Sequence, residues 1–134
     1  MSELVLWMRD LPMGDDVADI CGGAGRVTRI CIRRVTKKTG KNFDLVSGTD
    51  LRVPRERMAA CHHFKNKRCR IIIMAPPCTA YGRFTSVYAS QHPERQAERL
   101  DWYQPITDLC ADIAWLQLER GDDFLIEQPN GSKL

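Results

Sequence analysis

The feature that most constrains this chain is an apolar run, residues 70–75, that ends in Pro76-Pro77-Cys78. A run of this length without alternating polar residues is typical of a strand buried on both faces of a parallel sheet. Two successive prolines fix two backbone dihedrals and remove two hydrogen-bond donors, so the chain must turn there. The sequence therefore predicts a thiol on a stiff turn at the carboxyl end of a buried strand, where ligands bind in open α/β sheets.

The rest of the chain alternates between strand and helix patterns. We expect further strands over residues 17–21, 43–46 and 124–126, and helices from Arg26 to about Gly40, from Pro54 to about His63 and from Pro105 to Arg120. Residues 79–103 are expected to be a long irregular stretch with a helical part near residues 90–100. This alternation predicts one α/β domain over residues 1–134, with a parallel sheet covered by helices on both faces.

Composition and charge restrict the class of protein further. Hydrophobic residues make up 43% of the 134 residues and charged residues 28%, which allows a packed core and argues against a disordered chain. The net charge of +3 permits a nucleic-acid partner without requiring one. The sequence contains no membrane-length apolar run and no signal-peptide pattern. We therefore expect an intracellular protein, nuclear or cytoplasmic, with no membrane contact and with its six cysteines reduced.

Two other segments should end at the same sheet edge as Cys78. Asp19 and Cys21 lead into a glycine-rich turn, residues 22–25, whose flexible backbone could let a nucleoside approach closely; an ordinary tight turn is the equal alternative. Glu127 follows the last strand, which we expect beside the Cys78 strand, and a partly desolvated carboxyl there could donate a proton. For a cofactor ribose, Asp44 and Asp50 both qualify; we prefer Asp50, because Asp44 lies within the apolar stretch.

Residues 19–25, the Ala75–Cys78 turn and residues 126–129 together resemble the first, fourth and sixth motifs of DNA cytosine-5 methyltransferases. More narrowly, residues 74–82 and 127–132 are similar to the methyltransferase-like segments of some mobile-element polyproteins. The resemblance spans roughly residues 17–132, and the proline-proline-cysteine turn is its most specific part. It implies a Rossmann-like fold that binds S-adenosylmethionine.

The resemblance also implies a role for each matching residue. Cys78 would attack ring carbon 6 of cytosine, Glu127 would hold and protonate ring nitrogen 3, and carbon 5 would receive the methyl group. The implied cofactor contacts are Asp19, Cys21, Gly22, Gly23, Gly25, Asp50 and Pro76. In the stretch after Cys78, we expect Tyr81, Arg83 and Arg95 to grip an extruded base or its flanking phosphates. DNA is the expected partner, and RNA is an open alternative.

Departures from the family pattern define the alternative function. Thr79 stands where a glutamine commonly follows the cysteine, and Gln128-Pro129 stands where the family usually has Asn-Val. The sequence ends soon after the last strand, so we expect a C-terminally truncated core without a target-recognition region, joined to further domains if it comes from a polyprotein. The alternative is a catalytically inactive module, derived from a methyltransferase, that binds cofactor or nucleic acid.

Other interpretations of single motifs remain open. Adenine amino-methyltransferases have a proline pair at this place but an aromatic residue instead of the cysteine, and RNA cytosine-5 methyltransferases have a proline-cysteine turn. The segment Cys61-His62-His63 with Cys69 contains metal-ligand residue types, but its spacing fits no standard zinc finger, so we expect no metal. The basic residues between 26 and 41 either contact phosphates or form a solvated helix face.

Overall fold

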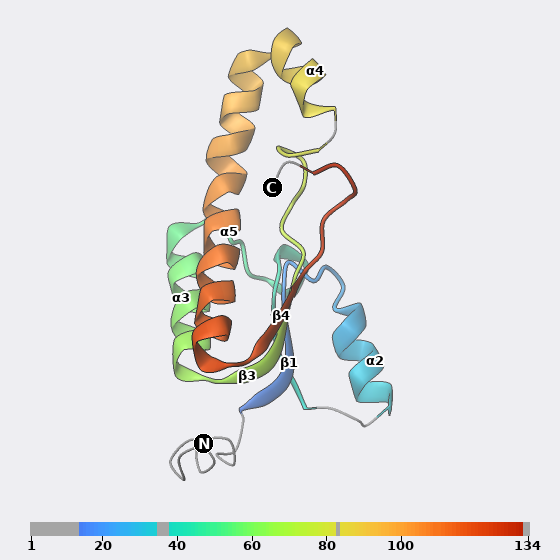
Figure 1. Ribbon diagram of the computed structural model, residues 1–134, viewed down its shortest axis with the longest axis vertical. Helices are drawn as coiled ribbons and strands as arrows, with labels where there is room; N and C mark the ends of the chain where they lie inside the picture. The colour runs from blue at the N-terminus through green and yellow to red at the C-terminus, as the bar shows by residue number, and fades with distance from the viewer. Residues whose placement is uncertain (1–13, 35–37, 83, 133–134) are drawn as a thin grey trace.

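The computed structural model describes residues 14–34, 38–82 and 84–132, in which four parallel strands form one sheet between two layers of helices (Figure 1). The strands are β1 (Asp15–Ile20), β2 (Thr39–Phe43), β3 (Cys69–Met74) and β4 (Asp123–Ile126), in the order β2-β1-β3-β4. The helices are α2 (Arg26–Arg34), α3 (Pro54–Asn66), α4 (Thr85–Gln91) and α5 (Pro93–Arg120), with a short 3-10 helix η1 (Leu45–Ser47). Helix α2 lies on one face, and α3 and α5 lie on the other. The predicted α/β class with a parallel sheet and helices on both faces is confirmed.

The strand order creates a crevice between the carboxyl ends of β1 and β3. The chain leaves β1 for β2 on one side and then crosses back to β3 on the other, so the connections diverge between β1 and β3. Ligands of open parallel sheets bind outside the carboxyl ends of the strands at such a divergence. The register keeps these ends level, because Ile20 pairs with Met74 and Met74 pairs with Ile126. We call this side of the sheet the carboxyl edge.

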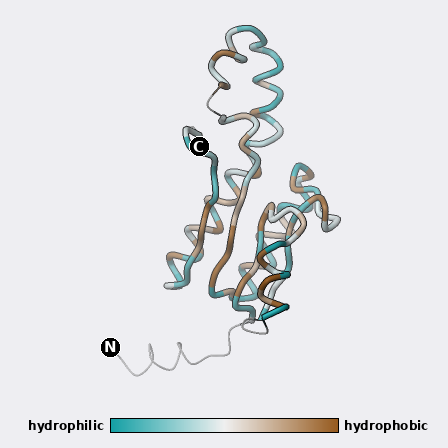
Figure 2. The backbone as a smooth tube through the Cα atoms, turned by 90° about the vertical axis from the view of Figure 1, so that its right-hand side faces the viewer, coloured by the Kyte–Doolittle hydropathy of each residue, from teal (hydrophilic) through white to brown (hydrophobic). Residues whose placement is uncertain are grey.

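The main core lies between the sheet and the layer of α3 and α5. Its fully buried members from the sheet include Ile20, Phe43, Ile72 and Met74, and Phe64 of α3 packs with them. Helix α5 adds a stripe with spacings of three and four residues, formed by Ile106, Leu109, Cys110, Ile113 and Ala114. Figure 2 shows hydrophobic residues concentrated along the strands. Among the described helices, none is both long and apolar enough to cross a membrane.

The two faces of strand β3 are buried to different extents. Ile72 and Met74 on one face are completely buried, whereas Ile71 and Ile73 on the other face are half-buried; at the start of the strand Arg70 is exposed and Cys69 is buried. The expected burial on both faces is therefore only partly correct. The reason is that α2 packs on β1 and β2 and leaves the same face of β3 and β4 less covered.

The second strand lies earlier in the sequence than expected. Instead of residues 43–46, β2 spans Thr39–Phe43, and Asp44 then caps η1 by accepting a hydrogen bond from the Val46 N–H at 2.8 Å. Gly40 lies inside β2 and does not end a helix. A Cβ at this position would lie 2.7 Å from Asp15 Oδ2, so this glycine marks a close approach to β1. Residues 35–37, near the expected helix end, lie outside the described residues.

Residues 79–103 are more helical than expected. Helix α4 ends at Gln91, and α5 begins at Pro93 and continues through Pro105, so a helix start at Pro105 is wrong. A proline inside a helix removes one hydrogen bond, which a helix of 28 residues can tolerate. Within residues 93–104 only Gln96 is buried. Together with α4, these residues rise beyond the carboxyl edge in Figure 1, and we call them the arm.

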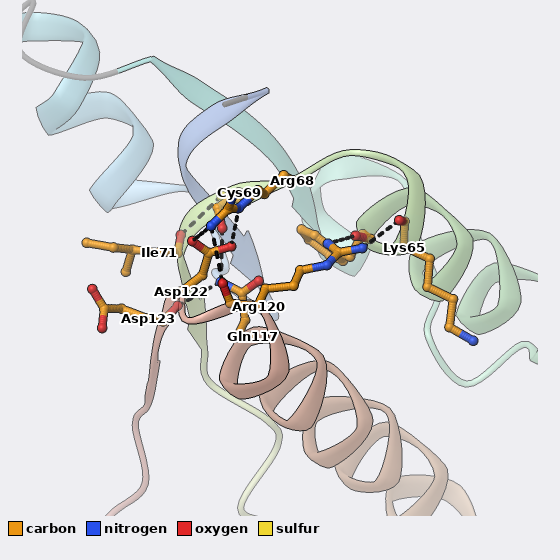
Figure 3. Close-up of polar contacts among 9 residues, drawn as sticks. Lys65, Arg68, Cys69, Ile71, Gln117, Arg120, Asp122 and Asp123 are labelled. Carbon is orange, nitrogen blue, oxygen red and sulfur yellow. Dashed lines mark hydrogen bonds and ion pairs between the residues drawn. The ribbon is translucent and has the colours of Figure 1, made fainter. Parts of the chain in front are cut away.

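Polar contacts at the opposite end of the sheet fix how α5 meets β3 and β4 (Figure 3). Arg68 donates two hydrogen bonds to the Asp122 carboxylate, at 2.7 and 2.9 Å. The buried Gln117 of α5 donates to the backbone carbonyls of Cys69 and Asp123, at 3.0 and 2.8 Å. Since Arg68 precedes β3 and Asp122 precedes β4, this ion pair aligns the starts of both strands and supports their register.

Replacing Arg68 with methionine should lower the free energy of unfolding by about 2–3 kcal/mol, because it leaves the Asp122 carboxylate buried without a partner. The Asp122 side chain is 5% exposed and that of Arg68 is 31% exposed, which places the effect below that of a fully buried pair. Urea unfolding followed by circular dichroism measures the change. The double variant R68M/D122L should regain much of the loss, and the exposed Arg70→Met is the control. If R68M has the same free energy of unfolding as wild type, the ion pair of Arg68 with Asp122 does not stabilise the fold.

Candidate functional site

The carboxyl edge brings the three predicted segments together. The Ala75 N–H donates to the carbonyl oxygen of Ile20 at 3.0 Å, and the Glu127 N–H donates to that of Met74 at 2.8 Å. The pairing of the strands therefore continues one residue beyond each strand end. As a result, the glycine turn after β1, the turn that carries Cys78 and the segment that begins with Glu127 leave the sheet side by side. The expected adjacency of the last strand and the strand before Cys78 is confirmed.

A side-chain hydrogen bond ties the Cys78 turn to the Glu127 segment. Gln128 Nε2 donates to the carbonyl oxygen of Pro76 at 2.7 Å, and Ser132 Oγ donates to Gln128 Oε1 at 3.0 Å. Pro76 is buried, and a buried carbonyl needs such a partner. In the sequence, Gln128 stands out only as a departure from a family pattern. Its long-range partner, 52 residues away, is visible only in the fold.

Cys78 is half-buried, and its own turn is anchored to α5. The Cys78 carbonyl accepts a hydrogen bond from the Tyr81 N–H at 2.9 Å. The Tyr81 ring is buried, and its hydroxyl donates to Gln104 Oε1 at 2.8 Å. Tyr81 was expected to contact nucleic acid. Its buried position instead supports a positioning role, in which it holds the Cys78 turn against the helix.

The other residues expected to act on the substrate differ in their placement. The Glu127 side chain is exposed to solvent, so the expectation that its carboxyl is partly desolvated is wrong. Arg95 is exposed on the arm, where a nucleic acid can reach it. Arg83 lies outside the described residues.

The geometry of the glycine turn is explained largely by the packing of the chain itself. A Cβ on Gly22 would lie 2.7 Å from Asp19 Cβ and 3.0 Å from Asn42 Oδ1. Gly23 and Gly25 have φ angles of 56° and 64°, which glycine adopts without strain. The N–H groups of all three glycines donate to acceptors within the chain. These three N–H groups are therefore not free to donate to a cofactor carboxylate.

Asp44, rather than Asp50, directly follows β2. Asp44 Oδ2 accepts a hydrogen bond from the Gly23 N–H at 3.0 Å, and Oδ1 accepts one from Val46, so this carboxylate joins the glycine turn to η1. A carboxylate has about four lone-pair sites, so both oxygens can accept further bonds. Asp50 forms a bidentate pair with Arg52, at 2.9 and 2.8 Å, and these hydrogen bonds lower the Asp50 pKa. The expectation of Asp50 rested on a strand over residues 43–46, whereas β2 ends at Phe43, directly before Asp44.

A pocket of about 280 Å³ opens at the crevice between β1 and β3. Asp44 and Asp50 line it as acceptors, and Leu51, Tyr103 and Ile106 supply apolar walls. Its size lies close to the lower end of the range of small-molecule sites, about 300–1,000 Å³. Carboxylates suit sugar hydroxyls and apolar walls suit a flat ring, so the pocket chemistry fits a nucleoside.

Two ionisable groups, the buried Asp19 and the half-buried Cys21, lie at the end of β1 next to the glycine turn. Burial raises the Asp19 pKa, and a hydrogen bond from Thr28 Oγ1 to Asp19 Oδ2, at 2.7 Å, opposes this rise. Burial and the nearby Asp44 raise the pKa of Cys21 to about 12, so this thiol stays protonated at neutral pH and is a poor nucleophile. Cys21 also has a φ angle of 56°, which side chains with a Cβ rarely adopt.

The histidine and cysteine residues considered as metal ligands have other surroundings. His63 packs against the rings of Phe43 and Phe64, each with a centroid distance of 5.2 Å, and burial lowers its pKa. Cys69 is buried in the core. Over residues 14–34, 38–82 and 84–132, no three His, Cys, Asp or Glu side chains gather as a potential metal site. Packing therefore accounts for His63 and Cys69.

Replacing Cys21 with valine should destabilise the protein by about 1–3 kcal/mol, because a β-branched residue is strained at positive φ. Chemical denaturation measures the change. Cys31→Val is the matched control, since Cys31 is also half-buried but lies in helix α2. Equal effects of the two substitutions would contradict the role of the backbone conformation.

Replacing Asp19 with asparagine should change the pH dependence of stability. Because the Asp19 pKa is raised on folding, the folded carboxyl binds its proton more tightly than the unfolded chain does. Its contribution to stability is therefore lost as the pH rises from about 3.8 through the folded pKa. The unfolding free energy of D19N, relative to wild type, should rise over this window and then level off.

Guanidinium unfolding at a series of pH values measures this difference, with the exposed Asp123→Asn as the control for losing one carboxylate. A difference between D19N and wild type that does not vary with pH would show that the burial of Asp19 has no effect on its ionisation.

The carboxyl edge thus combines a half-buried thiol, a carboxylate segment tied to the thiol's turn, and a nucleoside-sized pocket at the divergence of the strand connections. No protein-family model, curated protein or solved structure matches this chain. What this edge can do must therefore be judged from its own residues.

Proposed function

We propose that this protein is a cytosine-5 methyltransferase-like domain that uses S-adenosylmethionine and acts on DNA through Cys78. The observation that carries the proposal is that Cys78 and Glu127 follow neighbouring strands, β3 and β4, at one sheet edge. The hydrogen bond between Gln128 and Pro76 joins the two segments. A thiol and a carboxyl held in this way can act on opposite parts of one flat base.

The pocket beside Cys21 supports a nucleoside cofactor. Asp44 and Asp50 would accept hydrogen bonds from ribose hydroxyls, and Leu51, Tyr103 and Ile106 would surround the adenine ring. When bound, S-adenosylmethionine supplies the methyl group that ends on carbon 5 of cytosine. Pro77 also lines this pocket, so the cofactor site adjoins the turn that carries Cys78.

In the proposed reaction the Cys78 thiol would give its proton to water, and the thiolate sulfur would form a bond to carbon 6 of cytosine as the double bond between carbons 5 and 6 opens. Glu127 donates a hydrogen bond or a proton to ring nitrogen 3, which draws electron density out of the ring and favours attack by sulfur. Once carbon 5 carries the methyl group, it would release its proton to water, and nitrogen 3 would return any proton to Glu127. The double bond between carbons 5 and 6 would then re-form as the carbon–sulfur bond breaks and the Cys78 thiolate leaves. Because Glu127 is exposed, a bound base must shield it from water for this role.

Two observations favour a second candidate, a methyltransferase-derived module that binds its ligands without turnover. The N–H groups of Gly22, Gly23 and Gly25 already have acceptors within the chain, so they offer little to a cofactor carboxylate. The Glu127 carboxyl lies in water. Such a module would still use the pocket lined by Asp44 and Asp50.

Covalent trapping separates the two candidates. Folded protein supplied with S-adenosylmethionine and DNA that contains 5-fluorocytosine should form an adduct that survives denaturing electrophoresis, because fluorine at carbon 5 cannot be eliminated as the proton is. Cys78→Ser should abolish the adduct, and Cys61→Ser, at a half-buried cysteine of α3, should retain it. Cofactor binding by calorimetry without an adduct would indicate the inactive module.

The hydrogen bond from Gln128 to Pro76 should matter for the rate of adduct formation rather than for cofactor binding. Gln128→Leu removes the donor and leaves a buried carbonyl without a partner, so the Cys78 turn loses a fixed position relative to Glu127. We expect the adduct to form at least about tenfold more slowly, which corresponds to about 1.4 kcal/mol. Gln91→Leu, at an exposed glutamine of α4, is the control. If Q128L forms the adduct as fast as wild type, Gln128 does not position the Cys78 turn.

A further inference from the structure

A second groove, of about 400 Å³, lies between the arm and the residue that follows Cys78. It is lined by Thr79 and by six residues of the arm, namely Tyr88, Arg95, Glu98, Arg99, Trp102 and Tyr103. Tyr103 also lines the nucleoside-sized pocket, so the two hollows adjoin. We call this second hollow the arm groove. Thr79 places one side of this groove next to Cys78 in the sequence.

The arm groove presents aromatic faces and two arginines beside one glutamate, Glu98. Arg95, Arg99 and Trp102 are spaced by four and three residues on α5 and therefore share one face of the helix. The Arg99 guanidinium lies 4.2 Å from the centroid of the Tyr88 ring. Trp102 is 58% exposed although its ring is large and apolar. Within the part of the chain that the structure describes, neither Arg95 nor Arg99 forms an ion pair.

A stripe of negative charge runs beside this basic one. Glu94, Glu98 and Asp101 have the same spacing as Arg95, Arg99 and Trp102 but lie one residue earlier, so they form a neighbouring row on α5; all three are exposed. The phosphates of a single strand can contact Arg95 and Arg99. A second row, as in a duplex, would meet the carboxylates and be repelled.

We propose that the arm groove binds a single-stranded polynucleotide, with one base stacked on Trp102 and the adjoining phosphates held by Arg95 and Arg99. An aromatic side chain can stack only on a base whose face is free, and duplex pairing leaves both faces covered by neighbouring bases. The strand would then lead toward Cys78 past Thr79. The inference relies on the proposed function only for the base that reaches Cys78, because the binding itself needs neither cofactor nor methyl transfer.

Fluorescence anisotropy without cofactor tests the proposal. The probes are labelled DNA and RNA strands of about 12 nucleotides, which is within the range of single-strand binding sites, and a duplex of the same length. Both the DNA and RNA strands have the chemistry that the groove recognises, so tighter binding of either strand than of the duplex supports the proposal. Trp102→Leu should raise the dissociation constant for the strand by about 5- to 150-fold, the range that one stacked base supplies.

Trp115→Leu is the matched control for Trp102→Leu, because Trp115 is 67% exposed on the same helix but lies outside the arm groove. Arg95→Gln and Arg99→Gln should each reduce the salt slope of binding by about 0.7, the value for one phosphate of a single strand. Arg55→Gln, at an exposed arginine of α3, should leave the slope unchanged.

Two results would overturn the proposal: tighter binding of the duplex than of either strand, or equal effects of W102L and W115L. Comparison with covalent trapping separates this proposal from the proposed function. If a strand binds through Trp102 but no adduct forms at Cys78, the arm-groove proposal is supported and the proposed catalysis is contradicted. If an adduct forms but strand binding does not depend on Trp102, the proposed catalysis is supported and the arm-groove proposal is contradicted.

Discussion

The level register of β1, β3 and β4 is the constraint on which the rest of this structure depends. Because Ile20, Met74 and Ile126 lie side by side, the three chain segments that leave these strands emerge at one edge and continue to hydrogen-bond for one residue more. A shift of one residue in β4 would turn Glu127 to the other face of the sheet. The ion pair of Arg68 with Asp122, at the far end of the same strands, helps to prevent this shift.

The glycine turn beside the pocket offers few free donors to an anionic group. The amides of the glycine turn, which could bind an anion, are occupied by acceptors that include Asp44. Asp44 and Asp50 line the pocket, and Arg52, which pairs with Asp50, lines it too. The same hydrogen bonds that give the turn its shape therefore occupy the N–H groups that an anion would need.

Much of the fold could be predicted from the sequence, because long apolar runs and proline or glycine punctuation mark the strands that end at the carboxyl edge. The bounds predicted for the edge strand β2 are too late in the sequence, since Thr39–Phe43 is mostly polar and only its last residue is fully buried. The length of α5 was missed because Pro105 resembles a helix start. In the site, Cys78 and Glu127 could be placed from strand order alone. Asp44 and Gln128 could not, because their hydrogen-bond partners lie 21 and 52 residues away.

Helix α5 has two unlike halves that meet near Pro105. The residues after this proline carry the buried stripe, from Ile106 to Gln117, whereas Gln96 is the buried side chain before it. Substitutions in the first half therefore disturb few contacts of the core. During evolution this half can change its surface chemistry almost independently of the sheet, so descendants of one scaffold can acquire different ligands at the arm while they keep the same carboxyl edge.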